Sequence, residues 1–340
     1  LTEYGESKSI LDKMNESYKE YYLETVEGKS SYYAVPFYDS FYFIIYDMDL
    51  FEEKSLYMDG NGNFSDGSVK SVGKDGIPRT YDDGLPTTME EFFELCNVML
   101  YERGIKPFTF TGSENAYYPT KMMENYWASY EGYDNYLLNY TLDSNGEAYT
   151  FLDGTSEAIT IKNGYKLKDG QPGKKAAVQF LYNILKGYNG KGQNGDYHSS
   201  KVFASSQDNR AAQDEFLFST NTSQSIAFLI DATWWEREAV NSFADLVKRT
   251  DESNAYGTRR FGIMPMPTVH EGGGNTDVFS AVGENSQVFI NKNTEVPEET
   301  IDFFRFIHSD RILSLMTSYS NTLRPYQYTV TDTDKERMTP

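Results

Sequence analysis

The sequence predicts an α/β protein. Helical and extended apolar patterns alternate along all 340 residues, and such alternation is typical of a sheet covered by helices. Several extended runs are apolar on both faces, as the strands of a buried sheet are. The chain contains no internal repeat, and its length suffices for two compact lobes, or for one large domain, with a full core.

The first part of the chain is expected to place one helix and two strands before a long polar stretch. The run Phe-Tyr-Phe-Ile-Ile-Tyr over 41–46 is apolar on both faces and indicates a buried strand. Residues 59–84 are rich in Gly, Asn, Asp and Ser, which favours loops and turns. The expected elements are a helix over 9–22, a turn at 28–29, a strand over 32–36, a link over 37–40 and the strand over 41–46.

The middle of the chain is expected to be mainly helical. The run from Thr88 to Glu91 fits a capping box, which marks a helix start. The clearest helix covers 176–188, because its apolar residues recur on one face. The other expected elements are a strand over 105–110, a helix over 119–131 and hairpin-type turns at 143–146 and 162–164.

The last third continues the alternation of strands and helices. A buried strand is expected over 226–230, and the residues after it, Asp-Ala-Thr-Trp-Trp, lead into a helix that ends near Lys248. The other expected elements are a helix over 211–218, an extended run over 261–267, a short strand over 288–290 and a helix from Pro297 to about Met316.

Composition narrows the classes of partner. Lys and Arg number 31 against 51 Asp and Glu, so the net charge is −20. This acidity disfavours nucleic acid and anionic membrane surfaces, because both would repel the chain. The chain also has 28 Tyr, 22 Phe and 3 Trp. Tyr often lines wet binding surfaces, since it joins an apolar face to a polar tip, although any one ring could equally belong to the core or to ordinary surface.

Cysteine content and hydropathy exclude an internal disulfide and a membrane-spanning helix. Cys96 is the single cysteine and is expected in the core, so no disulfide can form within the chain. No apolar run approaches the length of a membrane span. Residues 1–4 lack the features of a signal peptide, so the protein is either cytoplasmic or has lost its export signal.

Two segments in the first third match a family signature. One runs from Gly28-Lys29 through Tyr33-Ala34-Val35-Pro36 to residues 44–51, and is similar to GK-x-Y-x-x-P … YNKDLF. The other, over 85–92, is similar to P-x-TW-x-EF, with Met89 in the usual place of Trp. Both signatures are those of the extracellular solute-binding proteins of family 1, the maltose-binding type.

Two further segments extend the resemblance toward the C-terminus. Residues 215–234 resemble F-x-x-G-x-x-AM-x-I-x-G-x-W, with Ala232 replacing Gly. Residues 261–267, followed by Pro297 and the helix beyond, resemble the family's crossing strand and its following N-lobe helix. No single segment is specific, but the four keep the family's order over nearly the whole chain.

The resemblance implies a two-lobed, periplasmic-binding-protein-like (type II) fold. In this fold two α/β lobes close on a solute held in the cleft between them. By resemblance, residues 1–38 and 267–318 form a partial N-lobe, and 39–266 with 319–340 form the C-lobe. The family's opening βαβ block has no counterpart before Leu1, so the N-lobe is expected to be incomplete at the start of the chain.

The two adjacent tryptophans are the first candidates for ligand contact. Trp234 matches the family position whose indole stacks on sugar, and it follows a strand at the start of a helix, where sites of α/β folds gather. Trp235 is a second candidate. For both residues the alternative is a buried place in the core.

Aromatic and polar residues elsewhere complete the expected cleft. Tyr38, Asp39 and Ser40 lie where the chain first crosses between lobes by resemblance, although a short polar link is otherwise only a turn. Tyr117 and Tyr118 precede a helix that resembles a ligand-contacting segment. The remaining candidates are Trp127, which could equally be core, Glu284, which could be a solvated turn, and Arg324, which could instead hold the hinge.

A metal site is not expected. Asp59, Asn61 and Asn63 resemble the first half of a calcium loop, but the Gly of the sixth position is missing and Lys70 stands where a bidentate Glu is needed. A polar surface loop is the alternative for this segment. The three histidines, His198, His270 and His308, show no zinc spacing.

The resemblance implies that the protein binds a solute and does not catalyse a reaction. The protein is expected to be the carbohydrate-binding component of an ABC transporter, with an oligosaccharide as solute, membrane permease subunits as partners and no cofactor. It is expected to be a monomer, and to be anchored outside the cell as a lipoprotein or to lie in the periplasm. A glycoside hydrolase remains open, because aromatic rings and carboxylates also line such clefts. A cell-surface glycan-binding module without a transporter also remains open, as do peptides and polyols as solutes.

Overall fold

The apolar runs of the sequence form the strands of one mixed sheet. The structure is a computed structural model that describes residues 6–64, 69–113, 117–188, 197–220, 222–267 and 283–338. The strands β4 (Lys106–Phe110), β7 (Ile226–Ala232), β3 (Val35–Asp47) and β8 (Phe261–Met264) are neighbours in that order. β4 and β7 are parallel, whereas β8 is antiparallel to β3.

Contacts divide the chain into two compact units. Unit 1 consists of Leu1–Phe41, Ala232–Val240 and Gly283–Pro340, and unit 2 consists of Tyr42–Asp231 and Asn241–Val282. The long strand β3 therefore contributes its first half to unit 1 and its second half to unit 2.

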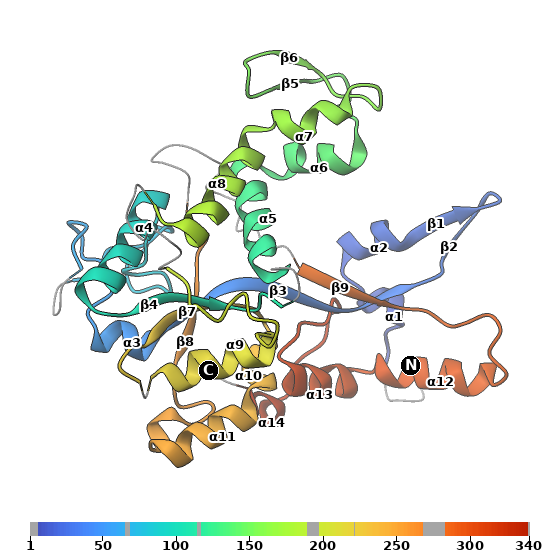
Figure 1. Cartoon of the computed structure of the whole chain (residues 1–340). Coiled ribbons are helices and arrows are strands. Elements are labelled where there is room, and N and C mark those ends of the chain that lie inside the picture. Colours follow the sequence, from blue (N-terminus) through green and yellow to red (C-terminus); the bar gives the residue numbers. More distant parts are fainter. Residues whose placement is uncertain are drawn as a thin grey trace. The chain divides into compact units, whose positions relative to one another are not determined.

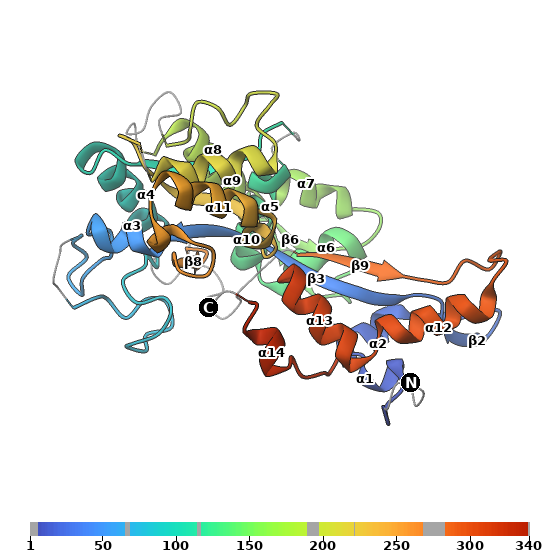
Figure 2. The same ribbon diagram turned by 90° about the horizontal axis from the view of Figure 1, so that it is seen from below.

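Unit 1 combines the two ends of the chain. The first half of β3 pairs antiparallel with β9 (Gly283–Val288), which lies beside it in both views (Figures 1 and 2). Its core brings Met14 and Val35 against Leu313 and Tyr326. The other elements of unit 1 are α1 (Ile10–Lys13), α2 (Glu16–Tyr22), β1 (Leu23–Val26), β2 (Lys29–Tyr32), α10 (Trp235–Glu238), α12 (Pro297–Ile307), α13 (Asp310–Ser320) and α14 (Asp332–Lys335).

Unit 2 is a layered α/β body. Helices α4 (Met89–Asn97), α5 (Tyr117–Glu131) and α8 (Pro172–Lys186) lie on one face of its sheet, and α9 (Asn209–Ser219) and α11 (Val240–Arg249) lie on the other (Figure 1). Aromatic rings fill the space between helices and strands: Phe92 stacks on Phe228 with centroids 5.8 Å apart, and Tyr126 stacks on Phe180 at 4.7 Å. Cys96 is buried in this core, as expected.

Several smaller elements complete unit 2. The capping box at Thr88 is confirmed, since the Thr88 hydroxyl accepts from the Glu91 N–H and the Glu91 carboxylate accepts from the Thr88 N–H. The other elements are α3 (Met48–Glu53), a π-helix (Val98–Glu102), α6 (Tyr133–Thr141), β5 (Ala148–Thr150), β6 (Ser156–Ala158), a 3₁₀ turn (Gly164–Lys166), α7 (Leu167–Gly170) and a 3₁₀ turn (Glu252–Asn254).

Three expected elements differ in the structure. The link predicted over 37–40 is part of one continuous strand, β3, because β9 offers backbone partners to residues 35–41. Gly283–Val288, and not 288–290, is the strand that pairs there. Neither predicted hairpin turn forms a hairpin: residues 143–146 lead from α6 to β5, and residues 162–164 lead into the 3₁₀ turn. The hairpin instead joins β5 to β6 through residues 151–155.

Two predicted helices are each interrupted. The helix expected over 9–22 breaks at Met14 and Asn15, where Met14 is extended and buried in the core. The helix expected from Pro297 to Met316 breaks at His308 and Ser309, and Ser309 is the N-cap of α13. The first break places the Met14 side chain in the core of unit 1, and the second places the His308 ring there. A continuous helix would point both side chains in other directions.

Two segments of unit 1 come from parts of the chain that the resemblance assigns to the C-lobe. The expected boundaries place 319–340 with 39–266, but residues of this tail pack in unit 1, where the Tyr326 hydroxyl donates to the Pro36 carbonyl. Ala232–Val240 also belongs to unit 1, since the Thr233 N–H donates to the Phe41 carbonyl at 3.0 Å. The assignment of the two units to the family's lobes stays a prediction.

No helix in the described part of the chain combines the length and the apolar composition that a membrane span requires.

Candidate functional site

Seven of the ten predicted ligand-binding residues belong to unit 1, although they come from four distant parts of the sequence. They are Tyr38, Asp39, Ser40, Trp234, Trp235, Glu284 and Arg324. The remaining three, Tyr117, Tyr118 and Trp127, belong to unit 2. Each group is described within its own unit.

β3 separates the three polar candidates that it carries. Side chains alternate between the faces of a strand, so Tyr38 and Ser40 share one face and Asp39 lies on the other. Ser40 is fully buried, while Tyr38 and Asp39 are partly exposed. The three residues therefore cannot all contact one solute through their side chains from the same face.

Asp39 points toward helix α2. Its Oδ1 accepts from the Tyr18 hydroxyl at 2.5 Å, and its backbone N–H donates to the Leu323 carbonyl at 2.9 Å. Burial raises the pKa of the Asp39 carboxyl above its ordinary value, and the bond from Tyr18 partly offsets this rise. A desolvated carboxylate with one fixed donor retains acceptor capacity for a hydroxyl.

Arg324 is anchored against β3. Its guanidinium lies over the Phe37 ring at 4.8 Å and near the Tyr38 ring at 5.7 Å, and Nη1 donates to the Phe37 carbonyl. Nη2 donates to the Ser320 hydroxyl, whereas Nε is buried without a hydrogen-bond partner among the described residues. These contacts favour a role in holding the local structure.

The two tryptophans differ in exposure. Trp234 is the N-cap of the short helix α10 and is partly exposed, whereas Trp235 is only 5% exposed. The hydrogen bond from Thr233 to the Phe41 carbonyl fixes Trp234 close to β3 within unit 1. The structure thus places Trp235 in the core and leaves part of Trp234 exposed to solvent.

Glu284 is opposite Ser40 in the β3–β9 ladder, and Asn285 is opposite Asp39. The alternative of a solvated turn for Glu284 is therefore wrong, because this residue lies in a strand. The Glu284 side chain lies outside the part of the chain whose side chains the structure describes.

In unit 2, an aromatic cluster surrounds Tyr42. The ring of Tyr42 contacts Tyr117 edge-on at 5.9 Å and Tyr118 at 5.0 Å, and its carbonyl accepts from Asn125 Nδ2 at 3.1 Å. Tyr118 is buried, whereas Tyr117 is partly exposed and carries the Lys121 ammonium over its ring at 4.9 Å. Of these rings, Tyr117 is the one that a solute could contact.

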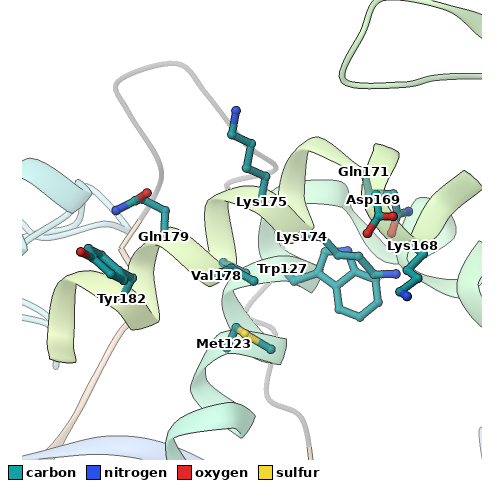
Figure 3. A pocket seen from close by; sticks show the side chains of 11 residues that line it. Met123, Trp127, Lys168, Asp169, Gln171, Lys174, Lys175, Val178, Gln179 and Tyr182 are labelled. Atoms are coloured by element: carbon teal, nitrogen blue, oxygen red, sulfur yellow. The ribbon is translucent and has the colours of Figure 1, made fainter. Parts of the chain in front are cut away.

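Trp127 does not join this cluster. It lies ten residues after Tyr117 on α5, which is about 15 Å at the rise of an α-helix. Its ring contacts Tyr136 edge-on at 4.6 Å and is 8% exposed. It lines a groove between α5 and α8 instead (Figure 3).

The segment resembling a calcium loop is closed by its own hydrogen bonds. Asp59 Oδ1 accepts from the N–H groups of Asn61 at 2.8 Å and Asn63 at 2.9 Å, which is the geometry of a turn. Lys70 places its ammonium 3.3 Å from the centroid of the Tyr57 ring. Residues 65–68 of this loop lie outside the described residues.

In the described part of the chain, no group of three or more His, Cys, Asp or Glu side chains is placed to hold a metal ion. His198 packs against Phe110 and Phe203, and His308 is buried in unit 1. His270 lies outside the described residues.

Sequence reasoning missed Tyr18 and Tyr42. Tyr42 follows Tyr38 and Ser40 at a spacing of two, so the alternation along a strand could have identified it once β3 was taken as continuous. Tyr18 carries no such signal, because its partner Asp39 lies 21 residues away and only the packing of α2 brings them together.

A family model for bacterial extracellular solute-binding proteins matches residues 4–311. No curated relative matches the sequence. Among solved structures, a "Chitin oligosaccharide binding protein" shares 16% identity with a TM-score of 0.57, over 97% of this chain and 62% of its own.

Two further solved structures are similar. RafE in complex with raffinose shares 16% identity with a TM-score of 0.56, over 96% of this chain and 64% of its own. Maltose-bound MalE3 of T. maritima shares 15% identity with a TM-score of 0.54, over 96% and 62%. The chain thus spans less than two thirds of the length of these structures, and at such identity the likeness shows the fold alone.

The fold is the α/β fold of two-lobed solute-binding proteins. The family model covers about nine tenths of the sequence, from the first helix of unit 1 into α13. The chain therefore belongs to the bacterial extracellular solute-binding protein family.

Proposed function

We propose that this protein captures a carbohydrate, most suitably an oligosaccharide, for an ABC transporter. The observation that carries the proposal is the family match over residues 4–311. The titles of similar structures name chitin oligosaccharide, raffinose and maltose as the ligands of those proteins, which supports the same class of ligand here.

The partly exposed groups within each unit suit a sugar. A pyranose has apolar C–H faces that pack on aromatic rings and a rim of hydroxyl groups that pair with carboxylates and cationic donors. Unit 1 contributes the indole of Trp234, and Asp39 as an acceptor. Unit 2 contributes the ring of Tyr117. In this proposal Tyr118, Trp235 and Arg324 support the local structure.

The proposal assigns the protein a delivery role outside the cytoplasm. Its partners are the membrane permease subunits of the transporter. The protein is a monomer that is anchored at the cell surface as a lipoprotein or lies in the periplasm. The strongly acidic charge is compatible with an exposed compartment, because it keeps the chain soluble.

The proposal includes neither chemistry nor a cofactor. Incubation with a bound oligosaccharide should leave the sugar intact, as followed by chromatography of the products. EDTA should leave the sugar affinity unchanged, because no metal takes part in binding. Cleavage of the sugar would instead favour a glycoside hydrolase.

A thermal-shift screen of mono- and oligosaccharides tests the proposal. A ligand that binds only the native state raises the melting temperature by mass action, by an amount that grows with its concentration. At least one oligosaccharide should give such a shift, while peptides and polyols should not. A shift with peptides alone would overturn the assignment of the solute class.

A further inference from the structure

A groove runs between helices α5 and α8 of unit 2, outside the aromatic cluster at Tyr42. The two helices lie side by side in both overall views (Figures 1 and 2). The groove has a volume of about 500 Å³, which falls in the range of small-molecule sites. Its lining comes from α5, α7 and α8 (Figure 3).

The wall of this groove is mainly apolar. Met123 and Trp127 line it from α5, and Val178 and Tyr182 line it from α8. Val178 is 57% exposed and Tyr182 is 56% exposed, so part of this apolar wall faces solvent. Binding of an apolar ring would remove this surface from water, which is favourable.

Trp127 closes one end of the groove. Figure 3 shows its indole among the side chains of Lys168, Gln171 and Lys174. The indole Nε1–H is buried and has no hydrogen-bond partner among the described residues. A buried donor without an acceptor costs free energy, so this end of the groove keeps an unmet polar group beside its apolar wall.

The lining of the groove carries an excess of positive charge. Lys168, Lys174 and Lys175 line the groove against one acid, Asp169, in a chain whose net charge is −20. Lys174 is held in place, since its Nζ lies 4.6 Å from the Trp127 ring centroid and donates to the Asn139 Oδ1 at 2.6 Å. A local excess of cations, one of them held in place, beside an apolar wall is complementary to an anion that carries a ring.

We propose that the groove between α5 and α8 is a second ligand site, and that it binds a small organic anion with a flat apolar ring, such as an aromatic carboxylate or sulfonate. The ring lies along Met123 and Val178, and the anionic group faces Lys168 and Lys174. The site is independent of the proposed sugar function, because Trp127 and Tyr117 lie ten residues apart on α5 and their rings have separate neighbours.

Titration with 8-anilinonaphthalene-1-sulfonate, followed by the rise of its fluorescence, tests the proposal. This probe joins an aromatic ring system to a sulfonate, and its uncharged analogue N-phenyl-1-naphthylamine has the same ring system without the sulfonate group. The wild-type chain should bind the anionic probe at one saturable site, at least fivefold more tightly than the analogue. The substitution Val178→Asp places a carboxylate in the groove and should weaken binding at least fivefold.

Two substitutions serve as matched controls. Val69→Asp makes the same change at a residue of unit 2 that is 88% exposed and outside the groove, and Phe303→Asp removes an exposed ring of α12 in unit 1. Both should leave the affinity for the probe unchanged, and all variants should melt at the wild-type temperature because the altered side chains are exposed. Equal binding by wild type and Val178→Asp, equal binding of the charged and uncharged probes, or no saturable binding would each overturn the proposal.

Discussion

Trp234 and Trp235 are neighbours in sequence but occupy different environments. Trp235 is buried in unit 1, whereas Trp234 retains exposed surface at the start of α10. Removal of a buried indole leaves a cavity and destabilises a protein by about 3–5 kcal/mol. Removal of a partly exposed indole that stacks on sugar mainly reduces affinity.

We therefore expect Trp234→Ala and Trp235→Ala to separate binding from folding. Trp234→Ala should weaken binding of the sugar found in the screen at least tenfold, and should leave the melting temperature nearly unchanged. Trp235→Ala should lower the free energy of unfolding by about 3–5 kcal/mol. Calorimetric titration and urea unfolding measure the two effects, and unchanged sugar affinity in Trp234→Ala would remove this residue from the site.

His308 should make the stability of unit 1 depend on pH. It is fully buried, its Nδ1–H donates to the Phe304 carbonyl at 2.7 Å, and its Nε2 has no hydrogen-bond partner among the described residues. Burial, with smaller contributions from the charges of Lys13 and Arg324, lowers the pKa of His308 from 6.5 to about 4. The unfolded chain therefore binds more protons than the folded chain between these two values.

The free energy of unfolding should consequently fall as the pH is lowered from about 6.5 toward 4, by on the order of 3 kcal/mol from this residue alone. The variant His308→Phe retains an aromatic ring and lacks this titration. Urea unfolding of both proteins at pH 7 and pH 4.5 should show a smaller loss in the variant. An equal loss in both proteins would mean that His308 is not the titrating group.

At the residue scale, the sequence identifies types of side chain better than their directions. The motif position of Trp234 could be read directly. The sequence did not predict that Tyr38 and Asp39 lie on opposite faces of a strand, because residues 37–40 are a strand only through their pairing with β9. The hydrogen bond between Asp39 and Tyr18 depends on long-range packing, which no local sequence pattern predicts.

At the scale of elements, the motif over 44–51 has a structural explanation. Asp47 ends β3 and caps α3, since its Oδ1 accepts from the Leu50 N–H at 3.0 Å. Its carboxylate is buried and also accepts from the Arg259 guanidinium, whose Nε lies 3.0 Å from Oδ2. One ion pair thus ties β3 and α3 to the segment that precedes β8.

Loss of Arg259 should be much more damaging than loss of its neighbour. Arg259→Met leaves the buried Asp47 carboxylate unpaired, which should lower the free energy of unfolding by about 3–5 kcal/mol. Arg260 pairs with Asp49 and Glu52 at the surface, so Arg260→Met should cost at most about 1 kcal/mol. Urea unfolding of the two variants checks the contrast, and a loss in Arg259→Met as small as the one expected for Arg260→Met would show that the Asp47 pair adds little.

Elements with strong local signals were predicted well. The capping box placed the start of α4 at Met89, and the apolar face of 176–188 identified α8, which begins at Pro172. The breaks at Met14 and His308 were missed because both residues have helix-compatible neighbours and are turned by the core of unit 1. The hairpin was misplaced because Asn-Gly at 145–146 is as good a turn signal as Asp-Gly at 153–154, and only the pairing of β5 with β6 distinguishes them.

At the scale of the whole molecule, the order of motifs predicted the family and the α/β fold. The boundary between the two units could not be predicted from composition, because a strand shared by both units shows no change of composition where it passes from one to the other. Residues 40–43 of β3, Ser-Phe-Tyr-Phe, cross this boundary within one continuous strand. The tail over 319–338 joins unit 1 through Arg324 and Tyr326, whose partners lie in the first 41 residues.

The most direct test of the account is calorimetric titration of the wild-type protein with oligosaccharides. We predict that at least one oligosaccharide binds with a saturable one-to-one isotherm, and that Trp234→Ala weakens this binding at least tenfold. The absence of binding by every oligosaccharide, with binding of a peptide or another solute in the same assay, would contradict the proposed function.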